Sequence, residues 1–285
     1  MSAAANATLV PASSRSSAPF IAADVGGTHV RIGLVDVSGD AGHPVRVQAY
    51  SKFRCADYAS LSDIVREFLD GLDAGTRVHV AVIASAGFPL EDGTVITANL
   101  PWPLSPARIR EQTGLSSVHL VNDFEAVAHA VAQLDANAVL RLTGPEQAAR
   151  GPALVLGPGT GLGGAVWIPT GARPVVLATE PGQAALAAGT DLEMDLLRQM
   201  LRQRSHVPIE HALSGPGLLN IYTALCALRG DAPRFARPGD ITAAALEGSD
   251  ARAREALDVF CGLLGSAVGD MALLYGVQSV YLAGG

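Results

Sequence analysis

Two glycine turns and a few carboxylates are the residues of this chain whose types and spacing could do chemistry. The first turn, Asp24-Val25-Gly26-Gly27-Thr28, stands between an apolar run and an alternating segment, which predicts a strand, a turn and a second strand. Gly26 and Gly27 would let backbone N–H groups approach a phosphate, while Asp24 could hold a magnesium ion or its water and Thr28 could donate its hydroxyl. An ordinary glycine hairpin is the commoner explanation of such a segment taken alone.

A second glycine turn repeats this design later in the chain. The apolar residues 153–156 lead into the glycine run 157–164, and residues 165–168 leave it as another strand. The repeat follows the first turn after roughly 130 residues, as an internal duplication would produce. Two phosphate clamps that face each other across a cleft are the simplest use. A Rossmann fingerprint is disfavoured, because the glycines lead into a strand and not into a helix.

Three acidic positions follow predicted strands or helices. Asn122 and Asp123 come directly after the apolar strand 118–121 and begin a helix, and ligands sit at this strand edge in open α/β sheets. Helix capping explains Asp123 equally well on this evidence. Glu180 follows the strand 175–179, and Glu210 follows a helix predicted over 191–202.

The elements that must position these residues alternate between helices and strands, which predicts an α/β protein. Apolar spacing predicts a helix over 58–72 and a buried strand over 78–83, and serine-proline starts predict helices from 105 and 214. A long helix is expected over 251–275. Its glycines, Gly262, Gly265 and Gly269, imply close helix packing. Because Asp258 and Asp270 interrupt its apolar run, we expect a buried helix and not a membrane span.

Composition limits the class of protein. The 285 residues are 49% hydrophobic and 16% charged, which is typical of a folded core, and we expect a soluble protein without a membrane segment. The net charge of -7 and the lack of a Lys/Arg cluster argue against nucleic acid as a partner. Cys55, Cys226 and Cys261 are scattered, so neither a disulfide framework nor a zinc site is predicted and a reducing cytoplasm fits. Residues 1–18 are expected to form a disordered tail.

The motifs, taken in their order, resemble the bacterial ATP-dependent glucokinase family of the actin-like and hexokinase-like ATPases. The matching pieces span nearly the whole chain, and the ordered set is specific although no single glycine motif is. They are residues 24–28 with Arg31, Asn99 with Trp102, Asn122-Asp123-Phe124, residues 157–164, Glu180, Glu210, residues 213–218 and residues 282–285.

The resemblance implies a two-lobed α/β fold of the actin-like ATPase (ribonuclease H-like) type, with a ligand cleft between the lobes. Residues 19–121 would form the small lobe and residues 122–285 the large lobe. The implied activity is phosphorylation of glucose at its 6-hydroxyl by ATP with Mg²⁺, which gives glucose 6-phosphate and ADP and feeds glycolysis in the cytoplasm. A homodimer is expected on the same ground.

The resemblance also implies a role for each matching residue. Asp123 would be the general base, taking the proton of the attacking hydroxyl. Asp24 would orient Mg²⁺ through water. The sugar would be held by Asn99, Asn122, Asp123, Glu180, Gln183 and Glu210. The phosphates and adenosine of ATP would be bound by Asp24, Gly26, Gly27, Thr28, Gly157, Gly159, Thr160, Gly161, Gly215, Gly284 and Gly285.

Three departures from the family pattern keep alternatives open. Pro181 and Gln183 stand in Thr179-Glu180-Pro181-Gly182-Gln183, where the family has Gly-Glu-Gly-Gly-His, so the preferred hexose is open. His29 replaces the usual Asn. The family chain also continues beyond the glycines at 284–285, so we expect the large lobe to be truncated at its C-terminal end. The alternatives are a degenerate paralogue that senses sugar or nucleotide, or a kinase for another hexose.

Overall fold

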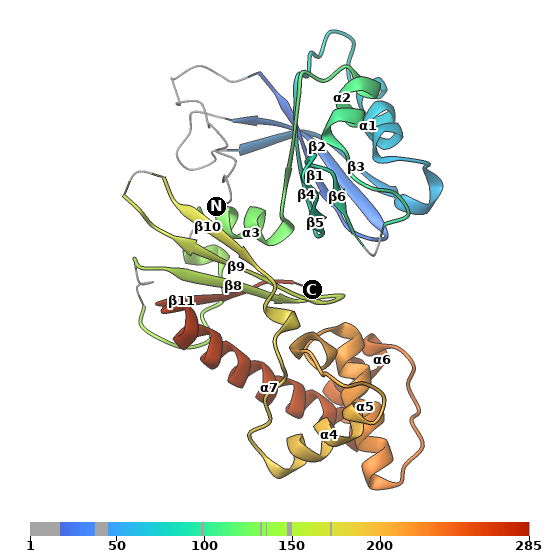
Figure 1. Cartoon of the computed structure of the whole chain (residues 1–285), viewed down its shortest axis with the longest axis vertical. Coiled ribbons are helices and arrows are strands. Elements are labelled where there is room, and N and C mark those ends of the chain that lie inside the picture. Colours follow the sequence, from blue (N-terminus) through green and yellow to red (C-terminus); the bar gives the residue numbers. More distant parts are fainter. Residues whose placement is uncertain are drawn as a thin grey trace. The chain divides into compact units, whose positions relative to one another are not determined.

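The computed structural model describes residues 18–37, 45–97, 100–131, 133–134, 136–146, 150–171 and 173–284. The chain divides into two compact units, residues 1–123 and residues 124–285 (Figure 1). Each unit contains its own sheet and its own apolar core. The sequence-predicted boundary at 121/122 lies two residues from this division.

The first unit is built on a five-stranded mixed sheet. The expected meander of β1, β2 and β3 is antiparallel, and β4 and β7 continue the sheet parallel to β1. Across the sheet the order is β3 (Val45–Arg54), β2 (His29–Val37), β1 (Phe20–Val25), β4 (Val80–Ser85) and β7 (Ser117–Val121). The carboxyl ends of β1, β4 and β7 therefore meet at one edge, where the sequence places its polar residues.

Two helices cover one face of this sheet, α1 (Leu61–Asp70) and α2 (Pro106–Thr113). Ser60 and Ser105 cap them by accepting hydrogen bonds from backbone N–H groups, and Pro106 supplies the fixed φ of a first helical residue. Alternate strand residues such as Ile21, Val30 and Ile83 are fully buried beneath them. The short pieces of this unit are η1 (Cys55–Asp57), β5 (Phe88–Pro89) and β6 (Val95–Ile96).

The second unit begins with α3 (Asp123–Val131), whose first residue still belongs to the first unit, and contains a four-stranded sheet. Antiparallel strands β8 and β9 form the second glycine hairpin, β10 extends it, and β11 pairs in parallel with β8. Their order is β10 (Val175–Thr179), β9 (Leu162–Ile168), β8 (Ala153–Pro158) and β11 (Ser279–Leu282).

A helical layer forms the remaining core of the second unit. Thr190 and Glu193 make a reciprocal capping box at the start of α4, and Ser214 and Asp250 cap α5 and α7. Large side chains such as Tyr222 and Leu213 are almost completely buried in this layer. Its elements are η3 (Pro181–Gln183), α4 (Asp191–Leu201), η4 (Ile209–His211), α5 (Gly215–Arg229), α6 (Pro238–Glu247) and α7 (Ala251–Tyr275), while η2 (Ala136–Ala138) lies between α3 and β8 in the chain.

The long helix α7 has the predicted bounds but not the predicted packing. Its length and hydropathy would suffice to cross a membrane, and only 17% of its most apolar 18-residue window is buried. One face, which includes Leu263 and Met271, packs in the helical core. The expectation of close packing at its glycines is wrong: among the described residues, and apart from the neighbouring backbone of α7 itself, no heavy atom lies within 4 Å of a Cβ added at Gly265 or Gly269, and one at Gly262 meets only Glu193 Oε1, at 3.9 Å. Only one face of this helix is therefore a core face.

Candidate active site

The first glycine turn is a tight connection between β1 and β2. The Gly26 N–H donates to the His29 carbonyl at 3.0 Å, which closes the turn. Asp24 lies opposite Arg31 in the β1–β2 register, and the Arg31 guanidinium donates to its Oδ2 at 2.9 Å. About half of each of these two side chains is exposed. The carboxylate of Asp24 therefore meets solvent, as a group that holds metal-bound water must.

Cys55 holds this turn in place through two hydrogen bonds, a role that the sequence patterns did not predict. Its backbone N–H donates to the Thr28 carbonyl at 3.0 Å and its thiol donates to the Gly26 carbonyl at 3.3 Å. Because Cys55 is 1% exposed, burial raises the pKa of its thiol, which keeps its proton and remains a donor. Only the pairing of β2 with β3 brings Cys55 here, so no short-range pattern could have revealed it.

The second glycine turn lies against the start of α5. Gly159 donates its N–H to the Gly161 carbonyl at 2.8 Å, and Gly215, the first residue of α5, donates to the Gly159 carbonyl at 2.8 Å. Ser214 accepts from the Gly217 N–H at 2.9 Å and so caps the helix, as predicted. The first N–H groups of α5 are engaged by these bonds, but the positive end of the helix dipole lies against the turn, where it favours an anion such as phosphate.

The glycines of the second turn are required by close contacts and not by unusual dihedral angles. A Cβ at Gly157 would lie 2.7 Å from the Phe124 ring, and one at Gly163 would enter that ring. A Cβ at Gly161 would lie 2.7 Å from Oε2 of Glu210. None of these three glycines has a positive φ. The ring of Phe124, which follows Asp123 directly, therefore packs against the backbone of this hairpin.

Glu210 connects the predicted sugar-binding residues with the second glycine turn. The Gln183 amide donates to its Oε1 at 2.8 Å, and the backbone N–H of Leu162 donates a long bond to its Oε2 at 3.4 Å. Ser214 donates its hydroxyl to the Glu210 carbonyl at 2.7 Å, which ties η4 to the cap of α5. The Gln183 N–H donates to the Glu180 carbonyl at 3.1 Å. The second unit thus brings Glu180, Gln183 and Glu210 together beside the turn.

His211 is held in its neutral form beside Glu210. Asn220 places its amide nitrogen 3.1 Å from His211 Nδ1 and 2.9 Å from the His211 carbonyl. Because an amide nitrogen only donates, Nδ1 accepts this hydrogen bond, as it can in a neutral imidazole. Burial is the main cause that lowers the pKa of His211; Arg204 lowers it further and Glu210 opposes the shift.

The structure places Asn122 and Asp123 where the sequence predicted them. β7 ends at Val121 and α3 begins at Asp123, so both residues stand at the carboxyl edge of the first sheet. Asp24 lies near the carboxyl end of β1, two strands away in the same sheet. The first unit therefore gathers the two aspartates at one edge.

The end of the described chain also follows the expected pattern. Ala283 donates its N–H to the Leu156 carbonyl at 2.9 Å, which extends the pairing of β11 with β8. Gly284 has a φ of 110°, and a Cβ there would lie 2.9 Å from the Pro158 carbonyl oxygen. Gly284 therefore belongs beside the second hairpin. Two predicted site residues, Asn99 and Gly285, lie outside the described residues.

The residues around Asp24 fit a magnesium ion held through water. Within the described ranges, no three His, Cys, Asp or Glu side chains cluster closely enough to enclose a metal ion. Magnesium differs from zinc in that one or two carboxylates, several waters and substrate phosphates suffice to bind it. The half-exposed carboxylate of Asp24 beside a glycine turn meets this requirement.

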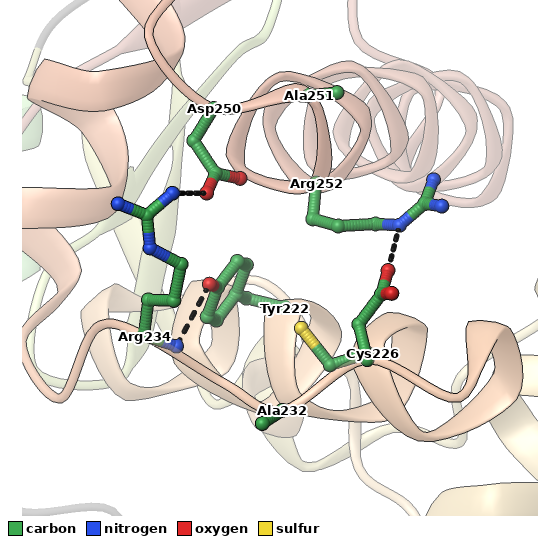
Figure 2. A pocket seen from close by; sticks show the side chains of 8 residues that line it. Tyr222, Cys226, Ala232, Arg234, Asp250, Ala251 and Arg252 are labelled. Atoms are coloured by element: carbon green, nitrogen blue, oxygen red, sulfur yellow. Dashed lines mark hydrogen bonds and ion pairs between the residues drawn. The ribbon is translucent and has the colours of Figure 1, made fainter.

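A cavity of about 330 Å³ lies elsewhere in the second unit, between α5, the loop that follows it and the start of α7 (Figure 2). Arg234 pairs with Asp250 at 3.2 Å, and Arg252 pairs with Asp231 at 2.6 Å. The charges that face the cavity are thus matched, and the two pairs tie the loop to α7. None of the sequence-predicted site residues lines this cavity.

Comparison with known proteins gives one consistent result. The sequence model of the family described as Glucokinase matches residues 21–285. A glucokinase-like protein of Xylella fastidiosa (strain 9a5c) is 56% identical over 269 residues, which cover 93% of this chain and 79% of that one. A glucokinase of Zymomonas mobilis is 38% identical, with 93% and 82% covered. The crystal structure of a glucokinase from an Antarctic psychrotroph matches with a TM-score of 0.81 at 33% identity, covering 94% of this chain and 83% of that chain.

Proposed function

Because the chain belongs to the glucokinase family of sugar kinases and has the two-lobed α/β fold of the actin-like ATPases, we propose that it is an ATP-dependent glucokinase. It transfers the γ-phosphoryl group of ATP to the 6-hydroxyl of glucose and releases glucose 6-phosphate and ADP. We propose further that it acts in the cytoplasm, supplies glycolysis and functions as a homodimer.

The observation that carries this proposal is the position of Glu210. One of its carboxylate oxygens accepts from Gln183, on the predicted sugar side, and the other accepts from the N–H of Leu162 in the second glycine hairpin. A hexose kinase needs its acceptor and its phosphates held side by side, because positioning supplies most of the catalysis in phosphoryl transfer. The Glu210 carboxylate therefore contacts both a residue predicted to bind sugar and the hairpin predicted to bind phosphate.

In the proposed reaction, Asp123 accepts the proton of the glucose 6-hydroxyl as that oxygen attacks the γ-phosphorus. A new O6–P bond forms while the bond from the γ-phosphorus to the bridging oxygen of ADP breaks. Backbone N–H groups of the glycine turns would donate to the phosphate oxygens, and the dipole of α5 would favour their negative charge. Magnesium, when bound through water to Asp24, neutralises charge on these oxygens. Asn99, Asn122, Glu180, Gln183 and Glu210 hold the sugar hydroxyls, and Gly284 and Gly285 lie against adenosine.

The decisive experiment is a coupled assay of glucose 6-phosphate formation with the wild-type chain and Asp123→Asn. Loss of the base should lower kcat by roughly 10²- to 10⁴-fold while glucose still binds. Asp191→Asn is a matched control, because Asp191 is an exposed carboxylate in the first turn of α4. Equal turnover in Asp123→Asn and wild type would remove Asp123 from the mechanism.

Gln183 favours the two alternatives, a kinase for another hexose and a degenerate paralogue that senses sugar or nucleotide. Its amide already donates to Glu210, and unlike a histidine it does not carry charge. Assays of several hexoses with ATP and Mg²⁺, together with direct binding of each sugar, separate these functions. Turnover of a different hexose would replace glucose as the substrate, and sugar binding without any turnover would support the sensor.

A further inference from the structure

The first sheet brings Arg31 of β2 beside two basic side chains of β3, Lys52 and Arg54, which follow it later in the chain. Arg31 in β2 lies opposite Lys52 in β3, and His29 lies opposite Arg54. Opposite residues on neighbouring strands share a face, as do residues two apart on one strand. Arg31, Lys52 and Arg54, which we name the basic row, therefore share one face with Asp24, beside the first glycine turn. The sequence showed no Lys/Arg cluster, because strand pairing creates this one.

The other face of the same strands belongs to the apolar core. Val25 and Val30 are buried, and Phe53 packs against the same cluster. The basic row is exposed, so its charges are available to a ligand and do not serve packing. Arg31 pairs with Asp24, whereas neither Lys52 nor Arg54 forms an ion pair within the part of the chain that the structure describes.

The electrostatic surroundings of His29 are consistent with this arrangement. The pKa of His29 is lowered, first by burial and then by Lys52, Arg31 and Arg54 in that order. All three cations thus lie close enough to act on one imidazole at the end of the turn. Like charges placed opposite each other on neighbouring strands, such as Arg31 and Lys52, repel and disfavour the pairing. A bound anion would relieve this repulsion.

We infer that the basic row binds the polyphosphate chain of the phosphoryl donor, a nucleoside triphosphate, beside the first glycine turn. The inference rests on the proposed function and adds Lys52 and Arg54 to its binding residues. A triphosphate offers several charged oxygens to three cations, whereas a sugar monophosphate offers a single phosphate group. Arg31 can hold Asp24 in place while Lys52 and Arg54 contact the phosphates.

The test is calorimetric titration of the full chain with magnesium tripolyphosphate, which lacks the nucleoside and the sugar. Lys52→Gln and Arg54→Gln should each raise the Kd about three- to tenfold, because each removes one exposed charge-assisted contact. Arg46→Gln is the matched control: Arg46 is also exposed on β3, but roughly 20 Å along the strand from Lys52. Its Kd should change less than about twofold.

A second measurement follows the imidazole of His29 by NMR. Lys52→Gln should raise the pKa of His29, because a cation that disfavours its protonation is gone. Tripolyphosphate bound to the wild-type chain should raise it as well, whereas Arg46→Gln should leave it unchanged. Unchanged thermal midpoints of the variants would show that they fold.

Several outcomes would overturn the inference. These are no binding of tripolyphosphate by the wild type, equal Kd values for wild type and Lys52→Gln, or an equal loss in Arg46→Gln, which would indicate unspecific attraction. If Lys52→Gln and Arg54→Gln lose affinity for glucose 6-phosphate but not for tripolyphosphate, the basic row binds the product and not the phosphoryl donor. If no hexose is phosphorylated but tripolyphosphate binding depends on Lys52 and Arg54, the proposed function fails and this inference stands. If Lys52→Gln and Arg54→Gln both show normal turnover and an unchanged KM for ATP, the inference about the basic row is contradicted and the proposed function is not.

Discussion

The two glycine hairpins look alike in sequence but are built for different physical reasons. In the first, a Cβ at Gly26 would lie 3.6 Å from the nearest atom, an ordinary contact, and charged side chains surround the turn. In the second, glycines at 157, 161 and 163 let Phe124 and Glu210 approach the backbone, and a helix start lies against the turn. If both hairpins bind phosphate, as we propose, the first would therefore do so mainly with side chains and the second with backbone.

This difference shows that a glycine motif does not define one mechanism. At the second hairpin glycine is a packing requirement, and the predicted phosphate-binding groups are backbone N–H donors, which every residue type except proline retains. At the first hairpin the proposed recognition would depend on residue types, which evolution can alter one by one. Substitutions should consequently affect stability at the second hairpin and ligand affinity at the first.

The sharpest test of the comparison is the same substitution in both hairpins. Gly163→Ala places a methyl group into the Phe124 ring and should lower the free energy of unfolding by about 1–3 kcal/mol. Gly26→Ala should change it by less than about 0.5 kcal/mol. Urea denaturation measures both. Gly159→Ala, where no heavy atom lies within 4 Å, is the control within the second hairpin. Equal losses at 26 and 163 would contradict the distinction.

Substitution of Cys55 tests whether its hydrogen bond to the Gly26 carbonyl holds the first hairpin in place. Cys55→Ala removes the hydrogen bond to the Gly26 carbonyl and should cost about 1–2 kcal/mol while raising the KM for ATP. Cys226→Ala provides the comparison, because Cys226 is equally buried but lies in the helical layer. It should lower stability without a change in that KM. If both variants alter the KM equally, Cys55 has no specific effect on the turn.

The smallest predicted effect concerns pH and the second hairpin. The pKa of His211 is lowered below its ordinary value of 6.5, so between these two values the unfolded chain binds more protons than the folded one. The contribution of neutral His211 is complete above pH 6.5 and declines as the pH falls through 6.5 toward the folded pKa. Urea midpoints between pH 8 and pH 5 should show this decline.

His211→Gln should remove that part of the pH dependence, because glutamine does not titrate in this range. His206→Gln is its control, since His206 is exposed and lies five residues earlier in the chain. A slope that persists unchanged in His211→Gln would show that other groups cause it. A slope lost equally in both variants would contradict the assignment to His211.

Much of the fold could be predicted because local patterns and burial agree. The bounds of β10 and α7 match the expected segments, and the caps at Ser105 and Ser214 lie where the sequence placed them. The exposure of the glycine face of α7 was not predicted, because glycine spacing alone does not show whether a partner helix exists. Residues 1–17 lie outside the described residues, so the expected tail stays a prediction.

The candidate site was predictable where strand ends determine it. Asp24 lies near the carboxyl end of one apolar strand and Asn122 and Asp123 follow another, and parallel strands bring their carboxyl ends to one edge of the sheet. Cys55, Lys52 and Phe124 escaped prediction because their roles arise from strand register or from packing between distant segments. The individual roles of the site residues in sugar and ATP binding remain predictions that the variants above address.

The two hydrogen bonds to Glu210 have a thermodynamic consequence. If a sugar hydroxyl displaces Gln183 from one carboxylate oxygen, the other oxygen shifts relative to the N–H of Leu162, and the phosphate hairpin responds. Reciprocity then requires that a bound nucleotide change the affinity for sugar by the same factor by which sugar changes the affinity for nucleotide. A single carboxylate would make the two ligands cooperative, so that neither binding constant is defined without the concentration of the other.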